Sequence, residues 1–200
     1  MLRRGEGLRY AIGCNWKLAI ENFIDVYHVP YVHPGLNGYC ALRDQYLVAD
    51  NDVFIGQGLD AYAPDDAAVG VFPAFPGLGP TASSHMEAFG VFPNLCMTLF
   101  HDNLRIILVE PDGPTRCAER VEVFLVGDEA ATDPALAPAR ATLVDRFRDF
   151  NAEDIGVVER LQRSFETTEW DGGHFTPVLD VMVHRFQRLV AASLARGEAG

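Results

Sequence analysis

A helical segment interrupted by proline constrains this chain more than any other stretch of its sequence. Residues 15–34 begin with Asn15, a side chain that caps helices. The apolar side chains that follow recur at helical spacing: Trp16, Ile20, Phe23, Ile24 and Tyr27. Pro30 lacks a backbone N–H, so we expect the helix to end just after His28, with Pro34 reinforcing the stop. The segment therefore predicts a helix followed by a change in chain direction.

The same stretch carries a carboxylate and two histidines. Asp25 and His28 are three residues apart, which predicts neighbouring positions on one helical face. His28 and His33 are five apart, and a continuous helix would rotate them about 140° from each other. A helix that ends at Pro30 instead lets the chain bring His33 back toward His28. Two imidazoles and one carboxylate on one face of an ion, with open positions, form the facial triad of non-haem Fe(II) oxygenases.

The carboxylate of such a triad would come from a distant segment. Residues 139–168 have apolar side chains at roughly helical spacing, with Asn151 as a candidate break. The acidic residues of this segment lie beside its apolar face. Spacing alone leaves Asp154, Glu153 and Asp149 as alternatives for the third ligand.

Composition excludes several classes of function. The 200 residues suit one domain, 1–200, and the net charge of −12 with a single lysine argues against nucleic-acid and anionic-membrane partners. No apolar run approaches the roughly 20 residues of a membrane span, and no signal peptide opens the chain, which predicts a cytoplasmic protein. The four cysteines form no metal-binding pair, and we expect reduced, mostly buried thiols: Cys14, Cys40, Cys96 and Cys117.

The remaining pattern is that of an antiparallel sheet followed by helices. Strands are expected at 8–14, 45–49, 53–59, 85–92, 95–101, 104–110 and 116–126, separated by short polar or proline-containing breaks that include 50–52. A final helix is expected at 178–196, and residues 34–43 and 127–138 look like loops. Residues 60–84 are either a loop that covers a site or a disordered surface insertion. This order predicts an α+β domain.

Two motifs resemble those of a known family. The residues Asn15-Trp16-Lys17, Glu21-Asn22-Phe23, Asp25-x-Tyr27-His28 and His33 resemble the catalytic-domain motif of Rieske-type non-haem iron oxygenases, the alpha subunits of aromatic-ring-hydroxylating oxygenases. The pattern Glu153-Asp154-x4-Glu159-x2-Gln162 resembles the second motif of that family. Between them, Phe92-Pro93-Asn94-Leu95 and Pro111-Asp112-Gly113-Pro114 stand in the expected order, so the resemblance covers nearly the whole chain.

The resemblance implies a role for each matched residue. His28, His33 and Asp154 look like the iron ligands, and Asp25 looks like the carboxylate that joins a ligating histidine to the Rieske cluster of a neighbouring subunit. Asn22 is similar to a residue that lines the site near iron. The implied fold is a helix-grip (START/Bet v1-like) domain, in which an antiparallel sheet wraps around a long C-terminal helix and additional helices carry the ligands.

The resemblance also implies cofactors and partners. These are a mononuclear Fe(II), O2, a small organic substrate, and electrons from NAD(P)H through a reductase and a ferredoxin-type Rieske donor. The C-x-H and C-x-x-H pairs of a [2Fe–2S] domain are absent from the sequence, so we expect that cluster on a missing N-terminal domain or a partner. A homotrimer or an alpha/beta hetero-oligomer is the expected assembly of the full-length protein.

The expected reaction is hydroxylation or oxidative demethylation of an aromatic or other small organic compound. The stretch from Tyr27 to Gly35 also resembles members that oxidise quaternary amines. Two other functions remain open: a helix-grip ligand-binding module without redox activity, and a zinc hydrolase that uses the same two histidines and aspartate.

Overall fold

One antiparallel sheet of seven strands forms the centre of the molecule. The computed structural model describes all residues except 51–52, 67, 69, 168–171 and 198–200. The strands are β1 (Leu2–Ile12), β2 (Gln45–Asp50), β3 (Phe54–Leu59), β4 (Met86–Val91), β5 (Leu95–Leu99), β6 (Asn103–Pro111) and β7 (Cys117–Val126). Their order across the sheet is β1-β7-β6-β5-β4-β3-β2, so the first strand pairs with the last and every other pair is sequential.

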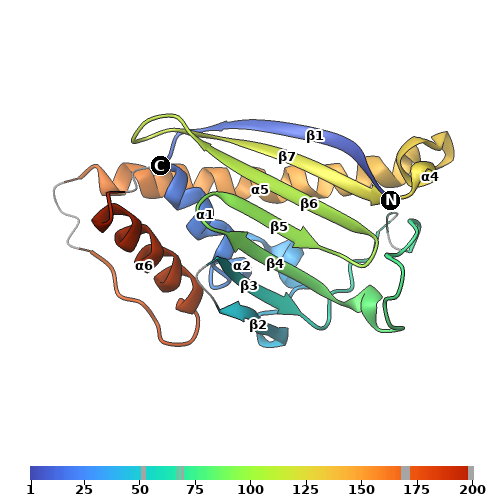
Figure 1. The fold of residues 1–200 in the computed structure, drawn as a ribbon, viewed down its shortest axis with the longest axis horizontal. Coiled ribbons are helices and arrows are strands. Elements are labelled where there is room, and N and C mark those ends of the chain that lie inside the picture. The colour runs from blue at the N-terminus through green and yellow to red at the C-terminus, as the bar shows by residue number, and fades with distance from the viewer. Residues whose placement is uncertain (51–52, 67, 69, 168–171, 198–200) are drawn as a thin grey trace.

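The helices lie against one face of this sheet. They are α1 (Trp16–Ile24), α2 (Val29–Val32), α3 (Pro34–Asn37), α4 (Asp128–Thr132), α5 (Ala137–Phe165) and α6 (Val181–Ala195), with short 3-10 turns at Leu42–Asp44, Ala82–Ser84 and Pro134–Leu136. In Figure 1 the long helix α5 runs behind the sheet, α1 lies between α5 and the middle strands, and α6 stands at one end. The arrangement is the helix-grip α+β fold that the sequence predicts, with α6 following the long helix.

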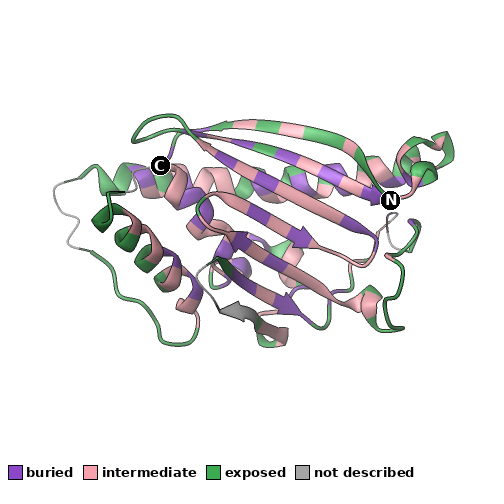
Figure 2. Ribbon diagram, in the orientation of Figure 1, coloured by how far each residue is buried: buried purple, intermediate pink, exposed green. Residues whose placement is uncertain are grey.

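The sheet places alternate side chains against the helices. Along β7 every second residue is buried, from Cys117 through Val121 to Leu125, and Figure 2 shows this alternation on the central strands. The same row contains one carboxylate, Glu119, that is also buried. All four cysteines are free and buried, as expected. Helices with the length and apolar character of a membrane span do not occur in the described part of the chain.

The structure corrects several predicted boundaries. Helix α1 ends at Ile24, before the predicted stop, and Pro30 instead stands in the first turn of α2, where its missing N–H is not needed. The stretch expected to be a loop at 34–43 contains α3, and that at 127–138 contains α4. Asn151 does not break α5, which is continuous over 29 residues. Residues 51 and 52 of the predicted 50–52 turn lie outside the described residues.

Residues 60–84 pack onto the domain through part of their length. Ala68 and Phe72 are buried in a small cluster with side chains of β7, α4 and α5, and Tyr62 is buried beside Leu59. Of the two alternatives, the covering loop therefore fits the structure better than the disordered insertion. Residues 67 and 69 of this stretch are among those not described.

Phe186 anchors α6 to the core, and its removal tests that packing. The side chain is 1% exposed and lies between the rings of Trp16 and Phe92, with centroids 6.0 and 6.1 Å away. We expect Phe186→Ala to lower the free energy of unfolding by about 3–5 kcal/mol, because it leaves a cavity in the core. Leu194→Ala on the same helix, at a side chain that is 64% exposed, should change it by less than about 0.5 kcal/mol. Urea unfolding followed by circular dichroism measures both, and equal losses would contradict the anchoring role.

Candidate metal centre

Asp25 ends α1 and positions His28. Its backbone is extended, with φ −76° and ψ 139°, and its carboxylate accepts the N–H groups of Tyr27 and His28 at 2.9 and 3.1 Å. These bonds compete with the next helical turn, and the chain leaves the helix. The same carboxylate lies 2.9 Å from His28 Nδ1. The contact between Asp25 and His28 is thus made across a turn, not along the helical face that the sequence spacing predicts.

Two short helices return the second histidine to the first. His33 lies at the junction of α2 and α3, and its backbone N–H donates to the carbonyl of Val29 at 3.0 Å. Its side chain is 2% exposed and makes an edge contact with the ring of Phe150. His28 Nε2 and His33 Nε2 are then 3.2 Å apart. The predicted convergence of the two histidines is present, through two short helices instead of one bend.

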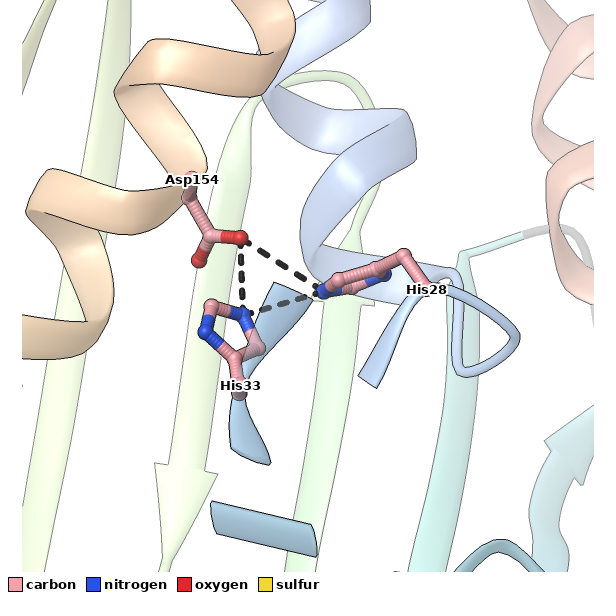
Figure 3. A group of neighbouring side chains, drawn as sticks. All are labelled: His28, His33 and Asp154. Carbon is pink, nitrogen blue, oxygen red and sulfur yellow. Dashed lines mark hydrogen bonds and ion pairs between the residues drawn. The ribbon is translucent and has the colours of Figure 1, made fainter. Parts of the chain in front are cut away.

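The carboxylate of Asp154 completes the group from α5. Its Oδ1 lies 2.9 Å from His33 Nε2 and 3.5 Å from His28 Nε2, and Figure 3 shows the three side chains pointing at one another. Glu153 instead contacts the opposite nitrogen of His33, Nδ1, at 2.6 Å. Asp149 is exposed on the same helix. Among the three acidic candidates, only Asp154 faces both histidines.

The inward-facing atoms are three acceptors. Asp25 and Glu153 each lie against an Nδ1 atom, which favours a proton on that nitrogen and leaves a lone pair on Nε2 of His28 and His33. Asp154 Oδ1 is buried without a hydrogen bond of acceptable geometry. Three lone pairs that converge on one point repel one another unless a cation or a proton lies between them. Two imidazoles, one carboxylate and the carboxylates behind the imidazoles fit a mononuclear Fe(II) site.

Electrostatics around the two histidines reflect the same demand for positive charge. Burial by itself would lower the pKa of His33, but the carboxylates of Asp154 and Glu153 outweigh it and raise that pKa above its ordinary value. For the carboxyl group of Asp25 burial acts in the opposite direction and would raise the pKa. Hydrogen bonds from His28 and Tyr27 outweigh burial and lower that pKa, so Asp25 is ionised at neutral pH. Within the described ranges, one group of three histidine, cysteine or acidic side chains is close enough to share a metal ion, and it consists of His28, His33 and Asp154.

A buried carboxylate of the sheet, Glu119, is joined to α5 one turn before the candidate ligand Asp154. Glu119 of β7 accepts a hydrogen bond of 2.9 Å from the side chain of Asn151, one turn before Asp154 on α5. Burial raises the pKa of Glu119 to about 7, the bond from Asn151 opposes this, and the negative charge of Asp154 adds to it. The sequence offers a signal for Glu119, the one charged residue among the inward-facing positions of this strand, which are otherwise apolar.

A cavity of about 160 Å³ adjoins the candidate ligands. Asn22, Asp25, His28, His33 and Asp154 all contribute to its lining, so all five residues singled out in the sequence lie around one space. Sequence reasoning missed most of the opposite wall: Gln45, Gln57, Tyr62, Thr98, Phe100 and Arg105. Arg105 has a recognisable signal, a lone charge within Leu104-Arg105-Ile106-Ile107-Leu108.

The fold and this site define a class of protein. The sequence matches the family model for the ring hydroxylating alpha subunit (catalytic domain) over residues 1–196, and the chain belongs to that family. Similar curated proteins include the choline monooxygenases, named as chloroplastic, of Arabidopsis thaliana and Beta vulgaris. The first is 28% identical over 92% of this chain and 40% of its own length, and the second is 26% identical over 88% and 36%.

Solved structures share the fold at low sequence identity. The quaternary ammonium Rieske monooxygenase CntA superposes with a TM-score of 0.75 at 17% identity, over 96% of this chain and 49% of its own. Dicamba monooxygenase gives 0.63 at 15% identity, over 97% and 60%. The chain therefore spans about two fifths of the curated relatives and about half of CntA.

Removal of one imidazole tests the metal site. We expect His33→Ala to weaken Fe(II) binding by more than the roughly 10–100-fold typical of losing a group behind a ligand, because an inner donor is lost. Asp154→Ala should weaken Fe(II) binding as much as His33→Ala does, and Glu153→Ala should weaken it less than either. Anaerobic titration with Fe(II) and metal analysis of the desalted protein measure the binding. His184→Ala, at an exposed histidine of α6, is the matched control, and equal binding by His33→Ala and the control would refute the site.

Glu119 gives a pH dependence of stability with a definite sign. Its pKa is about 7 in the folded protein against an ordinary value of 4.5, so between these values the folded chain holds more protons than the unfolded chain. Stability from the neutral Glu119 is present below about pH 4.5 and is lost as the pH rises to about 7. We expect Glu119→Gln to gain stability relative to the unsubstituted protein across this window.

Thermal unfolding of the metal-free protein at pH 5, 6, 7 and 8 measures this difference. Glu129→Gln, on the exposed short helix α4, serves as the surface control. If the melting temperatures of Glu119→Gln and of the unsubstituted protein differ by the same amount at all four pH values, the raised pKa of Glu119 is contradicted.

Proposed function

We propose that this chain is the catalytic domain of a Rieske-type oxygenase that binds one Fe(II) through His28, His33 and Asp154. The observation that carries the proposal is the convergence of two Nε2 atoms and one carboxylate oxygen, all within 4.8 Å of one another, in a chain of the ring-hydroxylating family. Iron bound by two histidines and one carboxylate supplies dioxygen activation beside an organic substrate.

The side chains around the ligands have separate tasks in this proposal. Asp25 and Glu153 hold the Nδ1 protons and fix the ring orientations of His28 and His33, so that both Nε2 lone pairs face the ion. Phe150 packs against His33 and keeps water from that side of its ring. Asn22 lines the cavity near the ligands, where its amide can orient the substrate or a water molecule.

Electrons reach the site through Asp25 in this proposal. Its carboxylate contacts His28 directly and is also partly accessible from outside, with 21% of the side chain exposed. A Rieske [2Fe–2S] centre of a neighbouring subunit would dock there, supplied by an NAD(P)H-dependent reductase, in a homotrimer or an alpha/beta hetero-oligomer. Inter-subunit electron transfer is described for one structurally similar protein, a quaternary ammonium Rieske monooxygenase.

The substrate is a small organic molecule that fits the cavity beside the ligands. An aromatic compound suits the rings of Phe23, Phe100 and Phe147 in its wall. A quaternary amine is the second candidate, supported by the choline and quaternary ammonium monooxygenases among the similar proteins. The cytoplasmic location stays a prediction, and the plant relatives are named as chloroplastic.

Reconstitution tests this function. The protein loaded anaerobically with Fe(II) is mixed with a Rieske donor, a reductase and NADH, and oxygen consumption is followed with a panel of aromatic and quaternary-amine substrates. We expect substrate-dependent oxygen uptake coupled to a hydroxylated or demethylated product. Asp25→Ala, loaded with an excess of Fe(II) to offset weaker binding, should lose about 10–100-fold in rate, because the contact behind His28 is gone.

Two results would argue for another function, and a third would change the proposed electron path. Uptake of Zn(II) with hydrolytic activity would favour a hydrolase. Binding of an apolar ligand without any Fe(II) uptake would favour a ligand-binding module. Full activity in Asp25→Ala would refute the proposed electron path and leave the iron site standing.

A further inference from the structure

The wall of the cavity opposite the ligands carries an uncompensated cation. Arg105 lies on β6 directly across from Thr98 of β5, which pairs with Ala88 of β4, which pairs with Gln57 of β3. Directly opposed residues of an antiparallel sheet point to the same face. These four side chains form one row across the sheet, and all four line the cavity that holds His28, His33 and Asp154.

Among the described residues, aromatic rings contact Arg105 and no carboxylate forms an ion pair with it. Its guanidinium lies 4.5 Å from the ring centroid of Phe147 and 5.6 Å from that of Phe100. Its Nε atom is buried without a hydrogen-bond partner, and none of the ion pairs within the described ranges involves it. Burial lowers the pKa of Arg105 to about 10, which leaves the side chain charged at neutral pH. A cation held this way is costly unless a partner arrives.

The second arginine of the cavity shows what a compensated guanidinium looks like. Arg146 of α5 forms an ion pair with Asp66 and donates a hydrogen bond of 2.9 Å to the hydroxyl of Tyr62. Of the described residues, only two carboxylates line the cavity, Asp25 and Asp154, and both face the histidines. Neither Asp25 nor Asp154 therefore compensates the positive charge of Arg105.

Other polar atoms of the same wall also lack partners. The side-chain oxygens of Gln45 and Gln57 are buried and unbonded, as is Nε of Arg146. A glutamine amide presents either its oxygen or its NH2 group after rotation of the terminal bond, so it serves a ligand as acceptor or donor. The orphaned polar atoms of this wall gather around a space that a ligand can enter.

We propose that the cavity selects a substrate carrying a carboxylate, which pairs with Arg105 while the carbon framework extends past Phe147 toward the metal ligands. A planar carboxylate matches the geometry of a guanidinium and accepts two parallel hydrogen bonds from it. The side-chain amides of Gln57 and Gln45 can form further hydrogen bonds with the same carboxylate. The inference rests on the proposed function for the reaction, and on the cavity alone for the binding. Within the quaternary-amine class it favours zwitterions that contain a carboxylate over a simple cationic alcohol.

Matched pairs of probes test this selectivity without turnover. Binding of benzoate is compared with benzamide, and binding of trimethylglycine with choline, by ligand-observed NMR and by the shift in melting temperature. We expect the carboxylate member of at least one pair to bind about ten-fold or more tightly and to raise the melting temperature. Arg105→Gln should remove this preference, Arg105→Lys should restore part of it, and Gln57→Leu should weaken the carboxylate member only.

Two controls separate binding in the cavity from binding at the surface or to the metal. Arg9→Gln, on β1 where Arg9 pairs with Glu110 at the surface, should bind the probes as the unsubstituted protein does. Each titration is done on metal-free and on Fe(II)-loaded protein, because a carboxylate can also ligate the metal. A preference that appears only with metal and survives Arg105→Gln would overturn the proposal, as would equal binding within both pairs or no binding of any probe.

Metal uptake is measured on the same samples, so the two proposals fail separately. Iron uptake without carboxylate preference overturns the inference about Arg105 and leaves the oxygenase proposal standing. Carboxylate preference without iron uptake supports the anion site and overturns the oxygenase proposal.

Discussion

Repulsion among three inward-facing acceptor atoms is the constraint on which the rest of this structure depends. The Nε2 atoms of His28 and His33 and the Oδ1 atom of Asp154 lie within 4.8 Å of one another, and a cation satisfies all three at once. These three atoms stay close together only because the rest of each side chain is fixed by its neighbours. Asp25 and Glu153 orient the imidazoles, and the position of Asp154 is fixed by the packing of α5.

Helix α5 links the candidate ligands to the cavity. Phe147, the adjacent pair Phe150 and Asn151, and Asp154 succeed one another at intervals of three or four residues, so they follow one face of a helix that runs without a break for 29 residues. One rigid helix therefore carries Phe150, which packs on His33, Asn151, which bonds to Glu119, and the candidate ligand Asp154. A site built on a helix that crosses the sheet keeps its geometry better than one built on loops.

Buried charges gather on the inner face of the sheet, where a purely structural core would be apolar. Glu119 is bonded to Asn151, one turn before Asp154 on α5, and Arg105 lines the cavity that the candidate ligands also line. Each costs stability where it lies, since burial opposes its ionised form. Their positions beside the candidate ligands give a functional reason for that cost, and the sign of each charge tells which kind of group it can receive.

The sequence by itself determined the strand alternation, the α+β order and the residue types of the site, because burial on one side of a sheet or helix imposes a period that can be read locally. It could not determine where α1 ends, since Asp25 stops that helix through bonds to Tyr27 and His28 that apolar spacing does not record. Spacing left Asp154 and Glu153 open and the family motif favoured Asp154, but only the tertiary structure shows Asp154 facing both histidines and Arg105 lining the same cavity. The rotation of α5 sets which acidic residue faces the histidines, and the packing of the helices on one face of the sheet places Arg105 at the cavity. Both come from contacts between residues far apart in the chain.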